Sequence, residues 1–159
     1  MGQVSEPVFH VVLLEPEIPP NTGTIGRLCL GTGCRLHLVE PLGFRIDQKT
    51  VRRAGLDYWK NVDLRVHADF EALLEALPGR MMTFTSAREG VSFTRHVFQP
   101  GEVLVFGRES VGLPEAFSQR FKGQFIRIPL RGSIRSLNLA QAVAVVLFEG
   151  LKQVQPELF

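Results

Sequence analysis

Cysteine and histidine are scarce in this chain, and their spacing argues against two kinds of site. The two cysteines, Cys29 and Cys34, are too few for a disulfide framework and are not spaced as a C-x-x-C pair. The four histidines, at positions 10, 37, 67 and 96, are scattered rather than spaced as metal ligands. We therefore expect two buried thiols and no dedicated metal site.

Long apolar runs are also missing. No run reaches the roughly 20 residues that a membrane-spanning helix needs, and residues 1–7 lack the basic flank and apolar stretch of a signal peptide. The 159 residues are 45% hydrophobic and 21% charged, as in an ordinary soluble domain. We therefore expect a single cytoplasmic domain over residues 1–159, with no membrane segment.

Three familiar signatures of enzymes are absent. There is no G-x-G-x-x-G after the first apolar run, no G-x-x-x-x-G-K-[ST] and no G-x-S-x-G. The fragment Gly31-Thr32-Gly33 falls at the end of a predicted helix. These absences argue against a dinucleotide-binding dehydrogenase, a P-loop nucleotidase and an α/β-hydrolase.

Acidic residues are absent from residues 116–148, although the net charge of the whole chain is only +2. The basic residues of that stretch are Arg120, Lys122, Arg127, Arg131 and Arg135. A second basic cluster consists of Lys49, Arg52 and Arg53. Charge alone is compatible both with solvated faces and with contacts to a nucleic-acid backbone.

The chain does contain an alternation of apolar, β-branched runs with helical patterns. Strands are predicted at residues 8–14, 36–39, 62–66, 80–85, 103–106 and 125–128. Helices are predicted at residues 47–54, 70–77, 115–121 and 137–154. Another helix is predicted from a cap at Asn21 or Thr22 to residue 30, closed by Gly33. Strands separated by helices predict an α/β fold with a mostly parallel sheet flanked by helices.

The last predicted helix, residues 137–154, is apolar on nearly all sides. Such a helix is either buried all round or shares its surface with a partner chain. We therefore expect a homodimer.

Three loops that follow predicted strands combine glycine or proline with polar residues. They span residues 15–23, 107–114 and 128–138. Taken singly, each has a structural explanation, because Asn21, Ser136 and Asn138 are good helix caps and glycines 107 and 112 suit turns. Taken together, they stand where ligands bind in parallel sheets, beyond the carboxyl ends of the strands.

These loops resemble the three motifs of the SPOUT methyltransferases, the trefoil-knotted class of RNA-modifying enzymes. The first motif resembles residues 15–19 and 21–23 with Arg27. The second resembles residues 106–107, Glu109 and residues 112–114, and the third resembles residues 128–130, 135–139 and 142–145. Residues 35–44 and 52–58 are similar to the short TrmL/YibK type of that class, whose members methylate the ribose of the wobble nucleotide in certain tRNAs. The similarity covers essentially the whole chain.

The resemblance implies an α/β knot fold, in which the C-terminal segment forms a trefoil knot. It implies S-adenosyl-L-methionine as the cofactor and no metal. The implied reaction is methylation of the ribose 2′-hydroxyl of the wobble nucleotide, a cytidine or modified uridine, in the tRNA anticodon stem-loop.

The resemblance also implies roles for individual residues. The cofactor-binding positions are Phe84, Gly107, Ile128, Ser136 and Leu137, and the catalytic positions are Arg27, Asn21, Glu109, Ser136 and Asn138. Arginine essentially always stays protonated. We therefore expect Arg27 to position the ribose or its phosphate and to stabilise negative charge on the oxygen. The residues expected to hold RNA phosphates are Lys49, Arg52, Arg53, Arg131 and Arg135.

Two other functions stay open at this point. One is methylation of a different ribose, in ribosomal RNA or elsewhere in tRNA. The other is an RNA-binding protein of the same fold that has no catalytic activity.

Overall fold

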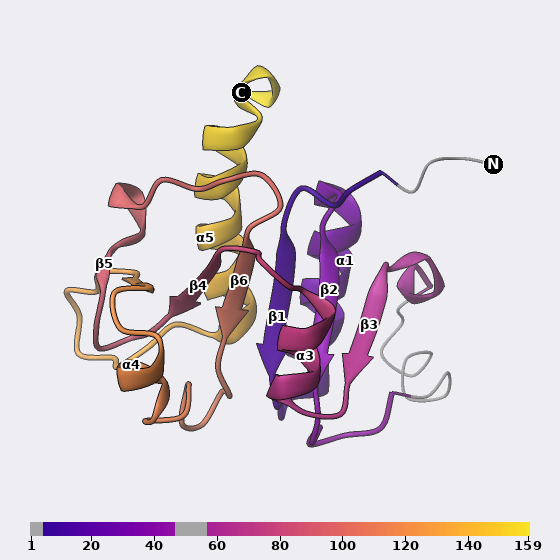
Figure 1. Ribbon diagram of the computed structural model, residues 1–159, viewed down its shortest axis with the longest axis horizontal. Coiled ribbons are helices and arrows are strands. Elements are labelled where there is room, and N and C mark those ends of the chain that lie inside the picture. The colour runs from indigo at the N-terminus through magenta and orange to yellow at the C-terminus, as the bar shows by residue number, and fades with distance from the viewer. Residues whose placement is uncertain (1–4, 47–56) are drawn as a thin grey trace.

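The computed structural model describes residues 5–46 and 57–159, which form an open parallel sheet with helices on both faces (Figure 1). Its strands are β1 (His10–Leu14), β2 (Arg35–Val39), β3 (Leu64–His67), β4 (Met82–Thr85), β5 (Val91–Ser92), β6 (Val103–Phe106) and β7 (Phe125–Arg127). The order across the sheet is β3-β2-β1-β6-β4-β7-β5, and neighbouring strands pair in parallel. The predicted α/β class is confirmed. The trefoil knot stays a prediction.

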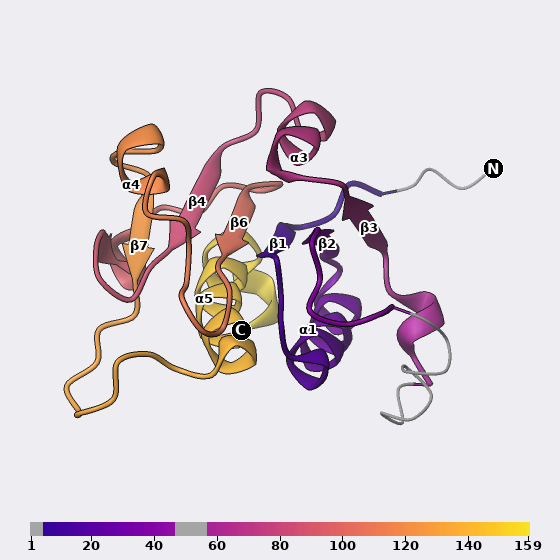
Figure 2. The same ribbon diagram turned by 90° about the horizontal axis from the view of Figure 1, so that it is seen from below.

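The helices within the described residues cover opposite faces of the sheet in two pairs. The helices are α1 (Pro19–Thr32), α3 (Phe70–Ala76), α4 (Phe117–Arg120) and α5 (Leu139–Val154), and short 3₁₀ turns lie at Trp59–Asn61, Phe93–Arg95 and Pro156–Leu158. Figure 2 shows α1 and α5 on one side of the sheet and α3 and α4 on the other. None of the helices described is long and apolar enough to cross a membrane. The helix predicted at residues 47–54 lies outside the described residues.

The sequence of β1 explains how both layers are held. Alternate residues of a strand point to opposite faces, and every residue of β1 is buried. Val11 and Leu13 belong to the core cluster beneath α1 and α5. Val12 and Leu14 belong to the cluster beneath α3 and α4. A continuous apolar run is typical of a central parallel strand covered on both faces.

The start of α1 differs from the prediction, and prolines explain the difference. The helix begins at Pro19, with Ile18 as an N-cap that makes no side-chain bond, rather than after a cap at Asn21 or Thr22. Proline is tolerated in the first turn because the N–H groups there have no partner within the helix. The side chain of Asn21 is therefore free for other contacts. At the other end, Gly33 closes the helix with a φ of 72°, as predicted.

The short edge strand β5 was not predicted from the sequence. Only Val91 and Ser92 pair with β7, so no alternating pattern is long enough to reveal the strand. The preceding residue, Gly90, lies so close to β7 that a Cβ atom there would be 2.3 Å from the carbonyl oxygen of Phe125. A glycine is therefore required for the two segments to approach.

Candidate active site

A large cavity lies beyond the carboxyl ends of β1, β4, β6 and β7. Its volume of about 730 Å³ lies within the range of roughly 300–1,000 Å³ that is usual for small-molecule sites. The strands β1 and β6 are neighbours in the sheet. After β1 the chain continues to β2 on one side, and after β6 it continues to β7 on the other side, so the cavity lies at a topological switch point. The cavity is lined by Ile18 and Asn21, residues 85–89, 106–115 and Ser118, Phe125, Ile128, Leu130, residues 135–139 and Ala142.

The second loop, residues 107–114, has a fixed backbone. The N–H of Arg108 donates to the carbonyl of Gly112 at 3.1 Å, and the N–H of Gly112 donates back at 2.8 Å. A Cβ atom on Gly107 would lie 2.2 Å from the carbonyl carbon of Gly112. Glycine at position 107 therefore lets this loop fold back on itself at the carboxyl end of β6.

Glu109 ties the second loop to the beginning of α1. Its carboxylate accepts hydrogen bonds from the backbone N–H of Glu17 at 2.8 Å and of Ile18 at 3.1 Å, and from Nδ2 of Asn21 at 3.4 Å. A negative charge at a helix N-terminus is favourable, and this one supplies the cap that Ile18 lacks. The bonds reach across more than 80 residues of sequence, from Glu109 to Asn21 and Glu17.

Asn21 and Asn138 extend this link to the third loop, residues 128–138. Nδ2 of Asn138 donates to Oδ1 of Asn21 at 3.0 Å. Oδ1 of Asn138 caps α5 by accepting from the N–H groups of Ala140 and Gln141. The predicted residues Asn21, Glu109 and Asn138 are therefore joined in one hydrogen-bonded chain.

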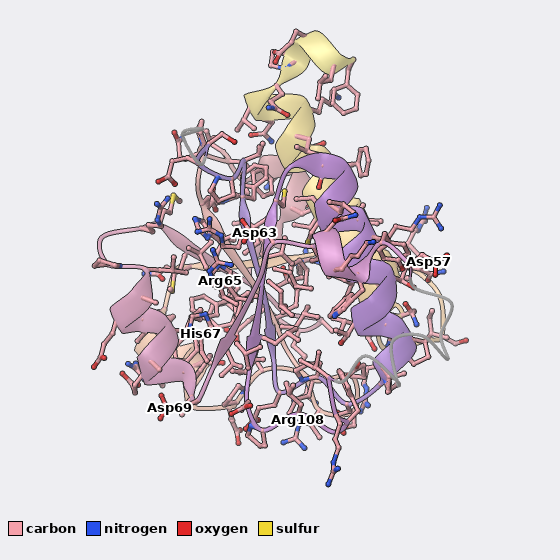
Figure 3. The ribbon with its side chains drawn as sticks, turned by 90° about the vertical axis from the view of Figure 1, so that its right-hand side faces the viewer. Asp57, Asp63, Arg65, His67, Asp69 and Arg108 are labelled. Atoms are coloured by element: carbon pink, nitrogen blue, oxygen red, sulfur yellow. The ribbon has the colours of Figure 1, made fainter. Side chains whose placement is uncertain are left out.

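A charged cluster lies beside that chain. Glu17 accepts from the N–H of Ser110 at 3.0 Å and from its hydroxyl at 2.7 Å, and these bonds lower the pKa of the Glu17 carboxyl. Arg108 faces Glu15 at 3.7 Å and Glu17 at 3.9 Å, while its Nε has no hydrogen-bond partner in the described part of the chain. Figure 3 shows Arg108 at the edge of the sheet where the strands end. Glu15 has a positive φ of 49°, which is uncommon for a residue other than glycine.

Four of the five predicted cofactor positions line the cavity, and Phe84 does not. Gly107, Ile128, Ser136 and Leu137 are among the lining residues. The Phe84 ring is fully buried, stacked on Phe121 at 4.4 Å and on Phe125 at 5.5 Å. Phe125, the partner of Phe84 in the pairing of β4 with β7, reaches the cavity instead.

Arg27 lies apart from the other predicted catalytic residues within this chain. It is exposed on α1, its guanidinium is 5.7 Å from the centre of the Tyr58 ring, and it does not line the cavity. Tyr58 is itself anchored to α1, because its hydroxyl donates to the carbonyl of Gly23 at 3.1 Å. The structure thus brings together Asn21, Glu109, Ser136 and Asn138, but not Arg27.

The predicted RNA-binding residues are placed only in part. Arg135 lines the cavity and Arg131 is exposed in the third loop. Lys49, Arg52 and Arg53 lie outside the described residues. Sequence reasoning missed two further arginines of the cavity, Arg88 and Arg108. The signal for both was their place within three residues of the ends of the predicted strands 80–85 and 103–106.

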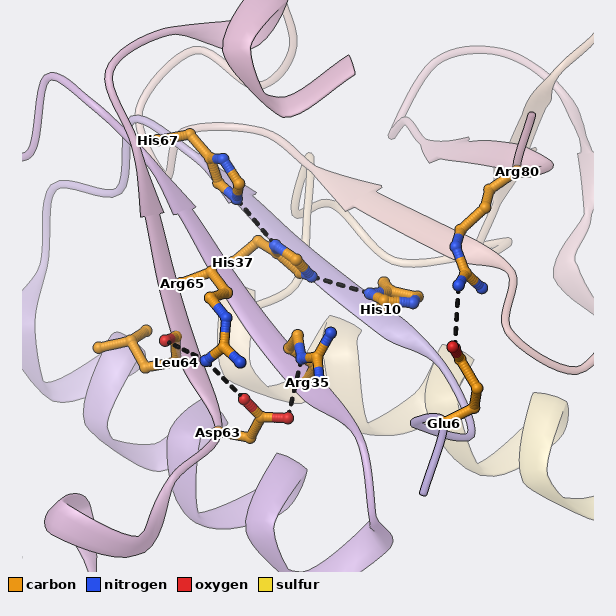
Figure 4. Close-up of polar contacts among 9 residues, drawn as sticks. All are labelled: Glu6, His10, Arg35, His37, Asp63, Leu64, Arg65, His67 and Arg80. Carbon is orange, nitrogen blue, oxygen red and sulfur yellow. Dashed lines mark hydrogen bonds and ion pairs between the residues drawn. The ribbon is translucent and has the colours of Figure 1, made fainter. Parts of the chain in front are cut away.

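Sequence reasoning also missed a row of histidines on the α3 side of the sheet (Figure 4). Nδ1 of His10 lies 2.9 Å from Nε2 of His37, and Nδ1 of His37 lies 2.9 Å from Nε2 of His67. The three rings come from the adjacent strands β1, β2 and β3. Burial is the main cause that lowers the pKa of His10 to about 4 and that of His37 to about 3. Within residues 5–46 and 57–159, no three histidine, cysteine or acidic side chains are grouped as metal ligands.

The parallel sheet and a ligand-sized cavity built from three loops define an α/β protein of the SPOUT methyltransferase class. Residues 8–148 match the SpoU rRNA Methylase family. The chain therefore belongs to the SpoU rRNA Methylase family.

Similar proteins agree with this membership. A Burkholderia ambifaria protein named tRNA (cytidine(34)-2'-O)-methyltransferase is 50% identical, over 92% of this chain and 96% of its own. A solved structure from work on the 2-OH methylation of C/U34 on tRNA has a TM-score of 0.87 and 44% identity, covering 96% of this chain and 99% of that one. An AdoMet-bound rRNA methyltransferase from Sinorhizobium meliloti has a TM-score of 0.80 and 27% identity, covering 94% of this chain and 58% of that one.

Proposed function

We propose that this chain transfers the methyl group of S-adenosylmethionine to the ribose 2′-hydroxyl of nucleotide 34, the wobble nucleotide, in the tRNA anticodon stem-loop. The observation that carries the proposal is the cavity in which three distant loops meet through Glu109, Asn21 and Asn138. The 50% identity to a tRNA (cytidine(34)-2'-O)-methyltransferase, along nearly the full length of both chains, supports the same substrate.

The lining of the cavity fits the proposed cofactor. Phe125, Ile128 and Leu139 form apolar surface suited to adenine, and Gly107 leaves backbone open to close approach. The hydroxyl of Thr85 is buried at the cavity with no hydrogen-bond partner among the described residues, so it offers a polar ligand a vacant donor and acceptor. The cofactor, when bound, supplies an activated methyl group. The residues of the chain need only hold the cofactor and the ribose in line, which can lower the activation barrier by roughly 7–11 kcal/mol.

Arg27 is proposed to stabilise the oxygen that accepts the methyl group. The guanidinium of arginine carries a permanent positive charge in proteins, so we propose that Arg27 acts through its charge and its hydrogen-bond donors rather than as a base. Ser136 and Asn138 complete the pocket on the side of the third loop. Arg131 and Arg135, together with Lys49, Arg52 and Arg53, are proposed to bind RNA phosphates.

The proposed homodimer explains why Arg27 is exposed outside the cavity of its own chain. Arg27 lies in the helix layer formed by α1 and α5 (Figure 2). In that layer α5 exposes Val145 and Phe148, which are 37% and 46% accessible, and α1 exposes Leu30. A second copy docked on this layer would cover the apolar residues and bring Arg27 of one subunit toward the cavity of the other. A single domain acting in the cytoplasm fits a tRNA substrate.

The test is transfer of tritium-labelled methyl groups from S-adenosylmethionine to unmodified tRNA, followed by mass spectrometry of the product. We expect one methyl group per tRNA, on the ribose of nucleotide 34. Methylation at another ribose, in tRNA or ribosomal RNA, would replace the proposed substrate with that one. Binding of RNA without incorporation into any RNA would identify a non-catalytic RNA-binding protein instead.

A further inference from the structure

Exposed apolar side chains gather at the mouth of the cavity, at a site where polar residues would be expected. Ile18, Val111 and Leu130 line the cavity, yet they are 45%, 66% and 38% exposed. They come from the three different loops that build the site. We call these three residues the apolar rim.

Hydrogen bonds hold the backbone around two residues of the rim, Val111 and Ile18. Val111 stands between Ser110, which is bonded twice to Glu17, and Gly112, which is paired with Arg108. The N–H of Ile18 is held by the carboxylate of Glu109. The two side chains are therefore held out toward solvent by fixed loops, so a ligand would meet a preorganised apolar surface.

The inner wall of the same cavity is a separate apolar surface. Phe125 and Leu139 are 7% and 9% exposed, so they line the depth of the cavity rather than its mouth. The inner wall is the surface that we assign to the adenine ring of the proposed cofactor. The rim remains available for a second apolar group.

The charges around the rim identify the kind of molecule that carries this group. Arg88, Arg108 and Arg135 line the same cavity, and Arg131 follows Leu130 directly. Two carboxylates of the cavity lining are engaged, since Glu109 binds the start of α1 and Glu89 accepts from Ser118. Two further carboxylates, Glu15 and Glu17, lie 3.7 and 3.9 Å from Arg108. Apolar side chains close to these arginines suit a nucleotide, whose base is apolar on its faces and whose phosphates are anionic.

We infer that the apolar rim holds the base of the nucleotide being methylated, turned out of the stack of its RNA loop. The inference rests on the proposed function. The base is joined to C1′, one bond from the carbon that carries the 2′-hydroxyl, so a ribose that reaches the cavity brings its base to the mouth. Recognition of single-stranded RNA commonly uses such splayed bases. Apolar side chains contact the face of a base rather than its hydrogen-bonding edge. The rim therefore acts as a surface that positions the reacting ribose.

The test is a cycle of two changes, Val111→Ser in the protein and removal of the target base from the RNA. The substrates are an anticodon stem-loop with cytidine at the target position and the same RNA with an abasic ribose that keeps its 2′-hydroxyl. Removing the base should lower kcat/KM of the wild type about tenfold or more. Val111→Ser should lower kcat/KM on the cytidine RNA roughly fivefold, and should cause no further loss on the abasic RNA. The affinity for S-adenosylmethionine should not change.

A matched control is Val97→Ser, because Val97 is also a solvent-facing valine, 67% exposed, and does not line the cavity. This variant should behave as the wild type on both RNAs. The inference is wrong if Val111→Ser costs the same factor on both RNAs, or if it changes cofactor affinity or the mass of the particle in solution. If the wild type methylates the cytidine RNA but the effects of Val111→Ser and of base removal on kcat/KM simply multiply, this inference alone is refuted. A wild-type chain that methylates no RNA refutes the proposed function and this inference together.

Discussion

Gly107 occupies a point at which no side chain fits, and this gives the first prediction. A Cβ atom there would lie 2.2 Å from the carbonyl carbon of Gly112, so Gly107→Ala must push the second loop out of place. Because losing one hydrogen bond to a ligand costs about 1 kcal/mol or more and every 1.4 kcal/mol is about tenfold in Kd, we expect cofactor affinity to fall roughly tenfold or more. Isothermal titration calorimetry with S-adenosylmethionine measures the change.

Gly31→Ala is the matched control for that substitution. A Cβ atom on Gly31 meets nothing within 4 Å, and the residue lies in α1. Alanine is favoured over glycine in a helix by up to about 1 kcal/mol, so this variant should unfold at slightly higher urea concentration and bind the cofactor normally. If Gly107→Ala bound the cofactor as well as Gly31→Ala does, the close approach at residue 107 would have no role in the site.

Single residues are also where sequence reasoning reached its limit. Gly107, Glu109 and Asn138 could be assigned to one pocket because each stands in a loop after a predicted strand or before a helix. The Phe84 side chain could not be placed, because the choice between Phe84 and Phe125 depends on how five phenylalanine rings pack beneath the cavity. Packing of that kind depends on contacts between distant segments, which composition and spacing do not reveal.

At the scale of elements, Asn138 performs two tasks that a pair of variants can separate. Its Oδ1 caps α5, and its Nδ2 donates to Asn21. Asn138→Asp keeps an oxygen for the cap and loses the donor, whereas Asn138→Ala loses both. We expect Asn138→Ala to lower the free energy of unfolding by about 1 kcal/mol. Asn138→Asp should unfold as the wild type does and still transfer methyl groups more slowly, because Asn21 loses its partner.

Urea unfolding and methyl transfer, measured on the same preparations, test this separation. Equal stability of the two variants would mean that the cap contributes nothing to α5. Equal and full activity of both would mean that the bond between Asn21 and Asn138 does not hold the site.

Elements marked by an apolar run or by a glycine stop could be predicted from the sequence. Elements that are defined only by contacts between distant segments could not. The strand at residues 103–106 was predicted with the bounds that β6 has, and the stop of α1 at Gly33 was confirmed. The start of α1 was predicted too late, because Pro19 and Pro20 are disfavoured in the interior of a helix but suit its first turn. Strand β5 consists of two residues, and only its pairing with β7 defines it.

For the whole molecule, the histidine row predicts loss of stability in acid. Burial of His10 and His37 lowers their pKa values to about 4 and about 3 in the folded chain, from 6.5. A lowered pKa means that the folded state binds protons less readily than the unfolded state. Stability is therefore complete above pH 6.5 and falls as the pH drops from there toward 4 and 3. By pH 5 the loss should be on the order of 2 kcal/mol for each of the two histidines.

Urea unfolding at about pH 7.5 and about pH 5 measures this loss, and His37→Gln identifies its source. The two proteins contain the same carboxyl groups, so the difference between the two losses of stability reports the contribution of the histidine. We expect His37→Gln to lose clearly less stability on acidification than the wild type. An identical loss would show that the row does not titrate with unfolding. The row could not be seen in the sequence, because His10, His37 and His67 meet only through the pairing of three strands.

The last prediction concerns assembly, because Arg27 and the cavity are separated within one chain. Arg27→Ala should abolish methyl transfer and leave cofactor binding nearly intact, whereas Gly107→Ala should impair cofactor binding. If Arg27 of one subunit serves the cavity of the other, a mixed dimer of the two variants contains one intact site. At a cofactor concentration too low to fill the Gly107→Ala cavity, random re-association of equal amounts then restores about a quarter of wild-type activity, although neither variant alone is active under that condition. Mixing after partial unfolding and refolding, with light scattering to verify the dimer, measures this recovery. A mixture that stays inactive while forming dimers would place Arg27 at the cavity of its own chain, and a monomer in every preparation would refute the shared site.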